Sequence, residues 1–230
     1  MRKVIGIIGG LSPESTTVYY EHIIRRYRER FNDHRYPEIV IYSVNFQKFI
    51  DWMRKEEWNE ITLELARVAH KLYRAGADFG LIATNTMHLV FDEVQKRSPI
   101  PLVSIVDATA EAIKEEGIGI VGLLGTIFTM TRGFYEDKLK AYGIEVITPD
   151  ADDMEYVDRV IFEELVNGVI RPESRRGFIR IINELKAKGA QGVILGCTEI
   201  PLLVRQEDVD VKLFDTTRIH AEKALELALS

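Results

Sequence analysis

The chain has 230 residues, of which 46% are hydrophobic and 29% are charged, so it is long enough to bury the core of one large domain or of two small ones. Its formal net charge of −6 and its pI near 5.5 argue against a nucleic-acid or anionic-membrane partner, because both surfaces would repel it. Its N-terminal apolar stretch is short and broken by glycines, no segment approaches the ~20 apolar residues of a membrane span, and its one cysteine excludes an internal disulfide, so we expect a cytoplasmic protein.

In the first half of the chain, short apolar segments alternate with longer helical patterns, which predicts βαβ units around a parallel sheet. Ser12-Pro13-Glu14 supplies an N-cap, a proline at the first helical position and an acid in the first turn, so a helix begins there. The predicted elements are a strand over 4–8, a helix over 13–30, a strand over 38–43, a helix over 58–75, a strand over 79–83 and a helix over 86–96.

The second half shows the same alternation of short apolar segments and helical patterns. The predicted elements are a strand over 119–124, a helix over 129–141, a strand over 144–147, helices over 153–167 and 172–188, strands over 192–195 and 211–214, and a helix over 217–229. Several of these strands are continuously apolar, which is typical of strands covered on both faces.

An internal repeat relates the two halves. Gly76-Ala77 precedes a strand that ends at Thr84, and Gly189-Ala190 precedes one that ends at Cys197. Both pairs are separated by an offset of 113 residues, which makes Thr84 and Cys197 equivalent positions. Because ligands favour the carboxyl ends of parallel strands, we expect these two residues to face one pocket.

Four segments carry a resemblance to a known family: Gly9-Gly10-Leu11-Ser12, Thr84-Asn85-Thr86-Met87-His88, Leu123-Leu124-Gly125-Thr126 and Gly196-Cys197-Thr198-Glu199. In this order and spacing they resemble the aspartate/glutamate racemase superfamily over nearly the whole chain. The chain is most similar to the subgroup described as L-specific, which shares Ser43-Val44-x-Phe46, Ile161-Phe162-Glu163-Glu164-Leu165 and Phe214-Asp215-Thr216.

The resemblance implies an α/β fold of two pseudo-symmetric parallel-sheet domains, usually a homodimer, with the active site in the cleft between the domains. We expect a first domain over 1–104 plus 215–230 and a second over 105–214. It also implies catalysis by two cysteines on opposite faces of the substrate Cα, without pyridoxal phosphate, any other cofactor or a metal. The substrate class is an acidic amino acid, aspartate or glutamate.

Cys197 is the expected base. A thiol with an ordinary pKa of ~8.5 becomes a workable base when a helix N-terminus or a nearby donor lowers that pKa, and Cys197 lies directly before the turn Thr198-Glu199-Ile200. Thr84 stands where the family pattern has its first cysteine, as in the L-specific subgroup. Its hydroxyl is too weak an acid to rest as an alkoxide, so we expect it to deliver a proton or to position a water that does.

The remaining expected site residues are substrate contacts. Backbone N–H groups beside Asn85 and Thr86, and beside Thr198, are suited to the α-carboxylate and to the charge that develops on deprotonation, although simple helix capping uses the same orientation. Arg54 is the expected partner of a distal carboxylate, Glu199 is expected to tune Cys197, and His88 is expected to have a core or supporting role. The expected contacts are Leu11, Ser12, Asn45, Arg54, Asn85, Thr86, Thr126, Thr129, Thr198 and Glu199.

Other functions stay open at this point. A single-cysteine decarboxylase of a malonate-like substrate also needs only Cys197, to protonate the enediolate after carbon dioxide leaves. A carboxylate-binding protein that has lost catalysis would explain Thr84. A lone cysteine is also often a small buried hydrophobe with no chemical role.

Overall fold

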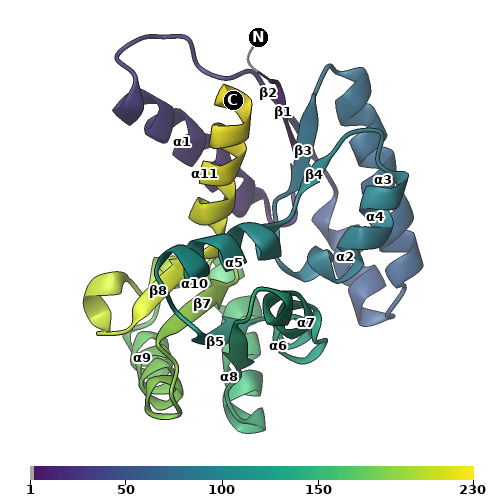
Figure 1. Ribbon diagram of the computed structural model, residues 1–230. Coiled ribbons are helices and arrows are strands. Elements are labelled where there is room, and N and C mark those ends of the chain that lie inside the picture. Colours follow the sequence, from purple (N-terminus) through teal and green to yellow (C-terminus); the bar gives the residue numbers. More distant parts are fainter. Residues whose placement is uncertain (1–2) are drawn as a thin grey trace. The chain divides into compact units, whose positions relative to one another are not determined.

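The structure is a computed structural model that describes residues 3–230, and it divides into two compact units (Figure 1). Unit 1 comprises the described residues up to Ile105 together with Thr217–Ser230, and unit 2 comprises Val106–Thr216. Met1 and Arg2, which belong to the predicted first domain, lie outside the described residues. Each unit contains one parallel four-stranded sheet, so the predicted α/β fold with two similar halves is confirmed.

Unit 1 has the sheet order β2-β1-β3-β4, with every pairing parallel. Its elements are β1 (Ile5–Gly9), α1 (Pro13–Arg30), β2 (Ile39–Ser43), α2 (Phe46–Arg54), α3 (Trp58–Arg74), β3 (Phe79–Ile82), the 3₁₀ helix η1 (Thr86–Val90), α4 (Phe91–Arg97), β4 (Leu102–Val103) and the C-terminal α11 (Thr216–Leu229).

The two faces of this sheet are covered by different helices. Alternate residues of a strand point to opposite faces. Ile5 and Ile7 pack with buried residues of α1 and α11, whereas a Cβ placed on Gly6 would meet Leu72 of α3 at 3.1 Å. Therefore α1 and α11 cover one face and α3 covers the other (Figure 1). Strands β1 and β3 are buried throughout, as their continuously apolar sequences predict, whereas the edge strand β2 is partly exposed.

Unit 2 has the equivalent sheet order β6-β5-β7-β8, again parallel throughout. Its elements are α5 (Ile105–Glu115), β5 (Ile120–Gly125), α6 (Ile127–Thr131), α7 (Phe134–Ala141), β6 (Glu145–Ile147), α8 (Ala151–Glu163), the 3₁₀ helix η2 (Leu165–Asn167), α9 (Pro172–Ala187), β7 (Gly192–Gly196), α10 (Ile200–Leu203), the 3₁₀ helix η3 (Gln206–Asp208) and β8 (Lys212–Asp215).

The repeat extends to individual hydrogen bonds. At the end of α3, the N–H of Gly76 donates to the carbonyl of Tyr73 and that of Ala77 to Leu72; at the end of α9, Gly189 and Ala190 bind Lys186 and Leu185 in the same way. Gly76 and Gly189 have φ of +94° and +108°, a region that favours glycine. A glycine in the left-handed backbone conformation thus ends α3 and α9 in the same way, and the chain continues into β3 and β7 at equivalent places.

Several predicted boundaries are corrected by the structure. The single helix predicted over 129–141 is two helices, because Gly133 has a φ of +74° and begins a new helix there. The helix predicted over 86–96 starts as the 3₁₀ helix η1, and the one predicted over 153–167 is α8 followed by η2, with Asp150 as N-cap. Helices α2, α5 and α10 and the two-residue strand β4 were not predicted. Within the described residues, no helix has the length and apolarity that a membrane span needs.

Candidate active site

The candidate residues of unit 1 follow the carboxyl ends of three neighbouring strands. Gly9 of β1 lies beside Ser43 of β2, and Ile8 of β1 lies beside Ile82 of β3. The segments after these strands therefore leave the same edge of the sheet. This edge brings together the segments that carry Ser12, Asn45 and Thr84, as expected for a ligand site on a parallel sheet.

The turn between β1 and α1 is tightly bonded. The Ser12 hydroxyl accepts a hydrogen bond from the N–H of Ser15 at 3.3 Å, so Ser12 is the N-cap that its sequence context predicts. The Thr16 hydroxyl accepts from the N–H of Gly10 at 2.8 Å and donates to the Ser12 carbonyl at 3.0 Å. Ser15 also donates to the carbonyl of Ala83 at 3.4 Å, which connects this turn to the end of β3. Ser12 is buried, and so is Leu11 beside it.

The main chain of Thr84 is held at both ends. Its N–H donates to the carbonyl of Ile82 at 2.8 Å, and its own carbonyl is 2.8 Å from Nδ1 of His88. Asn85 and Thr86 follow as buried residues, and the Asn85 side chain makes no capping hydrogen bond to η1. The capping interpretation is therefore wrong for the Asn85 side chain, and the first turn of η1 is closed by the backbone N–H of His88, which donates to the Asn85 carbonyl at 2.9 Å.

In unit 2, Cys197 directly follows β7. It is 8% exposed, and its Sγ donates a hydrogen bond to Oε2 of Glu199 at 3.0 Å. The Thr198 hydroxyl donates to the same oxygen at 2.6 Å, and Glu199 is itself buried. The Glu199 side chain does not cap α10, so its two hydrogen bonds hold the thiol and the adjacent hydroxyl together.

The electrostatic environment of Cys197 differs from the sequence-based expectation. Burial raises the pKa of the Cys197 thiol well above its ordinary value, and the negative charges of Glu199 and Asp158 raise it further. The backbone N–H of Glu199, in the turn that follows, lowers this pKa as expected, but burial and the two carboxylates outweigh it, so the net shift is upward. Cys197 rests as a thiol, and its S–H is already directed at a carboxylate.

Thr126 and Thr129 lie in the equivalent turn after β5. Gly125 at the end of β5 lies beside Gly196 at the end of β7, so Thr126 and Cys197 leave the same sheet edge. The Thr126 hydroxyl accepts from the N–H of Thr129 at 3.3 Å, which makes it the N-cap of α6. Both threonines are buried.

Asp158 of α8 was not among the predicted site residues. Its Oδ1 accepts a hydrogen bond from the N–H of Ile127 at 2.7 Å, and its charge acts on the Cys197 thiol. Burial raises the pKa of Asp158 itself. No local sequence pattern signals this role, because Asp158 lies 39 residues before Cys197 and meets it only through the packing of α8 against β5.

Arg54 belongs to α2, a helix that was not predicted, and Asn45 is the N-cap residue of the same helix. Asn45 precedes the first turn of α2 and is exposed, and Arg54 is its exposed last residue. Among the described residues, no carboxylate forms an ion pair with Arg54, so its charge is available to a ligand.

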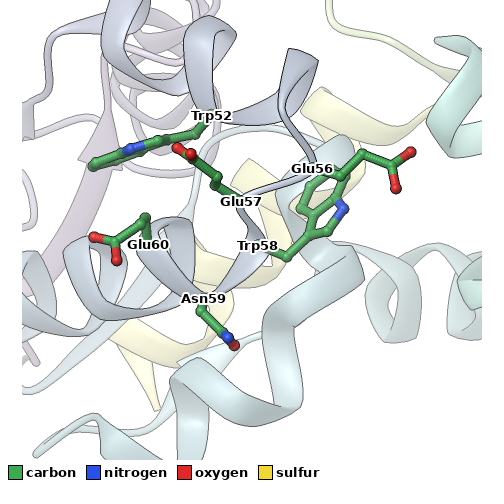
Figure 2. A pocket seen from close by; sticks show the side chains of 6 residues that line it. All are labelled: Trp52, Glu56, Glu57, Trp58, Asn59 and Glu60. Atoms are coloured by element: carbon green, nitrogen blue, oxygen red, sulfur yellow. The ribbon is translucent and has the colours of Figure 1, made fainter.

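A hollow of about 650 Å³ lies at the turn between α2 and α3. Figure 2 shows its two indoles, Trp52 and Trp58, on either side of Glu57. Glu56 and Glu60 add two further carboxylates to its lining. Because these charges would repel a dicarboxylate, this hollow is unsuited to an acidic substrate.

Comparison with known proteins identifies the family. Residues 8–224 match the Asp/Glu/Hydantoin racemase family. A crystal structure from Yersinia pestis, whose assignment as an Asp/Glu racemase is itself provisional, is 44% identical and has a TM-score of 0.93, covering 99% of this chain and 100% of the other. An aspartate racemase homologue from Pyrococcus horikoshii is 45% identical, with a TM-score of 0.87 and coverage of 100% of both chains.

A curated relative is the broad specificity amino-acid racemase RacX of Bacillus subtilis, which is 24% identical over 233 residues and matches 99% of both chains. The family match therefore spans nearly the whole chain, and it includes the strand ends that carry Thr84 and Cys197 in two equivalent sheets. This protein belongs to the Asp/Glu/Hydantoin racemase family.

Proposed function

We propose that this protein is a cofactor-independent racemase of an acidic amino acid, aspartate or glutamate, in which Cys197 exchanges the α-proton. The observation that carries the proposal is the hydrogen bond from the Cys197 thiol to Glu199, at a strand end within the racemase family match. A cysteine that served only as a buried hydrophobe would not need a carboxylate acceptor in a buried position.

Glu199 supplies the acceptor that a resting thiol requires. Transfer of the S–H proton to Glu199 produces a thiolate, and no base other than Glu199 is needed. The Cys197–Glu199 pair carries one negative charge before and after the transfer. The thiolate then removes the proton from the substrate Cα. Glu199 is thus the first acceptor of the thiol proton, and Cys197 is the group that contacts the reacting carbon.

Thr84 serves the opposite face of the substrate. Its hydroxyl, or a water that it positions, gives a proton to the carbanion. The alkoxide or hydroxide left behind regains a proton from solvent, and the Cys197–Glu199 pair releases its one extra proton to solvent. The cycle therefore consumes and releases no proton overall.

The substrate class rests on the residues available for two carboxylates. N–H groups in the turns beside Asn85 and Thr198 suit the α-carboxylate. Arg54, which has no carboxylate partner among the described residues, suits the distal one. Ser12 and Thr126 contribute through the turns that they cap.

The test is proton NMR of both enantiomers of aspartate and glutamate with the enzyme in D2O. Enantiomers have equal free energy in water, so kcat/KM must be equal in the two directions. A one-cysteine site still permits unequal exchange: we expect one enantiomer to gain deuterium with retention faster than it inverts. Equal exchange and inversion rates for both enantiomers would contradict the one-cysteine mechanism.

Three variants complete this test. Cys197→Ala is expected to abolish exchange, and Thr84→Cys to raise the inversion rate toward the exchange rate, because a second thiol then serves the opposite face. Thr84→Ser is the matched control, since it keeps the hydroxyl. Absence of exchange with all four substrates would refute the proposal. In that case, release of carbon dioxide from a substituted malonate would indicate a decarboxylase. Binding of a carboxylate without any reaction would indicate a non-catalytic protein.

A further inference from the structure

His88 connects two parts of the main chain in unit 1. Its Nδ1 lies 2.8 Å from the carbonyl oxygen of Thr84, and its Nε2 lies 3.0 Å from the backbone nitrogen of Ile105. The ring is 5% exposed and stacks on Phe91, with 5.0 Å between centroids and an interplanar angle of 7°. The imidazole is therefore fixed in position as well as hydrogen bonded.

These two contacts determine the tautomer. A backbone N–H only donates, so Nε2 accepts from Ile105 and carries no proton. A carbonyl only accepts, so Nδ1 carries the proton and donates it to Thr84. His88 is therefore a neutral imidazole protonated at Nδ1, and both ring nitrogens are used.

The ring replaces a main-chain bond that an α-helix would make. In an α-helix, the Thr84 carbonyl would accept from the backbone N–H of His88. That N–H binds the Asn85 carbonyl instead, at 2.9 Å, and the turn becomes a 3₁₀ helix. The His88 side chain thus satisfies the Thr84 carbonyl, while the Thr84 N–H is held by Ile82.

We propose that His88 is a positioning residue for Thr84. With both main-chain groups of Thr84 bonded, the direction of its Cα–Cβ bond is set, and so is the direction from which its hydroxyl approaches a substrate. This inference rests on the proposed function, because it assigns to His88 the aiming of the group that serves the face opposite Cys197.

The hydrogen bond between His88 and Ile105 lies where the chain leaves unit 1. Ile105 is the last residue of the first segment of unit 1, and Val103, two residues earlier, accepts a hydrogen bond from Nε2 of His220 at 2.9 Å. His220 lies on α11, near the residue where the chain re-enters unit 1. His88 therefore ties the Thr84 turn to residues 103–105, which α11 also holds through His220, whose ring centroid lies 5.9 Å from that of His88.

Two amide variants separate the two contacts. In His88→Asn the amide nitrogen is close to the place of Nδ1 and keeps the donor to Thr84; in His88→Gln the amide is close to the place of Nε2, keeps an acceptor for Ile105 and loses the donor. We expect His88→Gln to lower the inversion rate about tenfold or more, since small misplacements of a reacting group are costly. Its exchange of the Cys197-facing enantiomer should remain near the wild-type rate, and His88→Asn should retain most of both. His70→Gln, at an exposed position of α3, is the matched control.

Parallel loss of exchange and inversion in His88→Gln would overturn the proposal, because that is the result of a purely structural role. Wild-type inversion by His88→Gln would overturn it as well. A second measurement needs no activity: long-range ¹H–¹⁵N NMR of the wild-type imidazole should report a proton on Nδ1 at neutral pH. A ring protonated at Nε2 or at both nitrogens would refute the tautomer. If the wild-type enzyme exchanged no amino acid, the proposed function would fail while the tautomer measurement still decided the contact to Thr84.

Discussion

The Sγ of Cys197 donates a hydrogen bond to Oε2 of Glu199 across 3.0 Å, in a buried position where Asp158 contributes a second negative charge. Burial and these two carboxylates raise the pKa of the thiol, so the resting protein holds a protonated nucleophile next to its proton acceptor. Removing the Glu199 carboxylate should therefore make the thiol more reactive toward an alkylating reagent and less active as a proton carrier.

Replacing Glu199 with Gln removes one negative charge and provides an amide donor to the sulfur. We expect the pKa of Cys197 to fall, so that iodoacetamide alkylation proceeds at lower pH than in the wild type. Deuterium exchange into the substrate should fall about 10²–10⁴-fold, the range for loss of a general acid–base group. Glu163→Gln on the exposed side of α8 is the control for charge removal. Unchanged exchange in Glu199→Gln would contradict the proton-acceptor role.

Arg54→Ala tests the distal carboxylate. Loss of a charge-assisted pair of about 1.5–3 kcal/mol predicts that KM for aspartate and glutamate rises about 10- to 100-fold, with a smaller change in kcat. Arg74→Ala, at the exposed end of α3, is the matched control and should leave KM unchanged. If KM for the acidic amino acids is the same in both variants, Arg54 does not bind the distal carboxylate.

The acid stability of the protein should depend on His220. Burial lowers the pKa of His220 from 6.5 to about 4 in the folded protein. The folded state therefore stays neutral at this position while the unfolded chain takes up a proton below pH 6.5. The contribution of His220 to the free energy of unfolding should fall by about 3 kcal/mol as the pH drops from about 6.5 to about 4.

Urea unfolding as a function of pH measures this dependence. His220→Phe should be less stable than the wild type at pH 7, because the Tyr19 hydroxyl and the Val103 carbonyl lose their partner, but its stability should decline less on acidification. His22, whose pKa is also lowered to about 4, keeps its own contribution in this variant. The exposed His70→Gln variant should follow the wild-type curve, and a His220→Phe curve parallel to the wild type would exclude this origin of acid sensitivity.

The two equivalent helix endings should respond alike to the same substitution. A Cβ on Gly76 or Gly189 meets nothing within 4 Å, so Gly76→Ala and Gly189→Ala test the positive φ alone. We expect each variant to lose about 1–2 kcal/mol of unfolding free energy, the cost of a side chain in the left-handed region. Gly119→Ala, whose φ is not positive and whose nearest contact is 3.9 Å away, should be near neutral. Losses that differ by more than about 1 kcal/mol between the two sites would show that the halves are not equivalent there.

Many elements could be predicted because their signals are local. Ser12, Pro13 and Glu14 occupy the positions that capping, a restricted φ and the helix dipole favour, and α1 begins at Pro13 as predicted. The offset of 113 residues was visible because the two halves repeat the same residues at helix ends and strand starts. Helix α5 was not predicted, although its buried residues follow a helical spacing.

The sequence by itself determined the α/β class, the repeat and the equivalence of Thr84 and Cys197, because propensity, periodicity and motif spacing are properties of neighbouring residues. Tertiary structure decided the state of the site. The raised pKa of Cys197 depends on its burial and on Asp158, and the tautomer of His88 depends on Ile105. Burial and hydrogen bonding between residues far apart in the chain arise only when the elements pack, so no local sequence pattern could predict them.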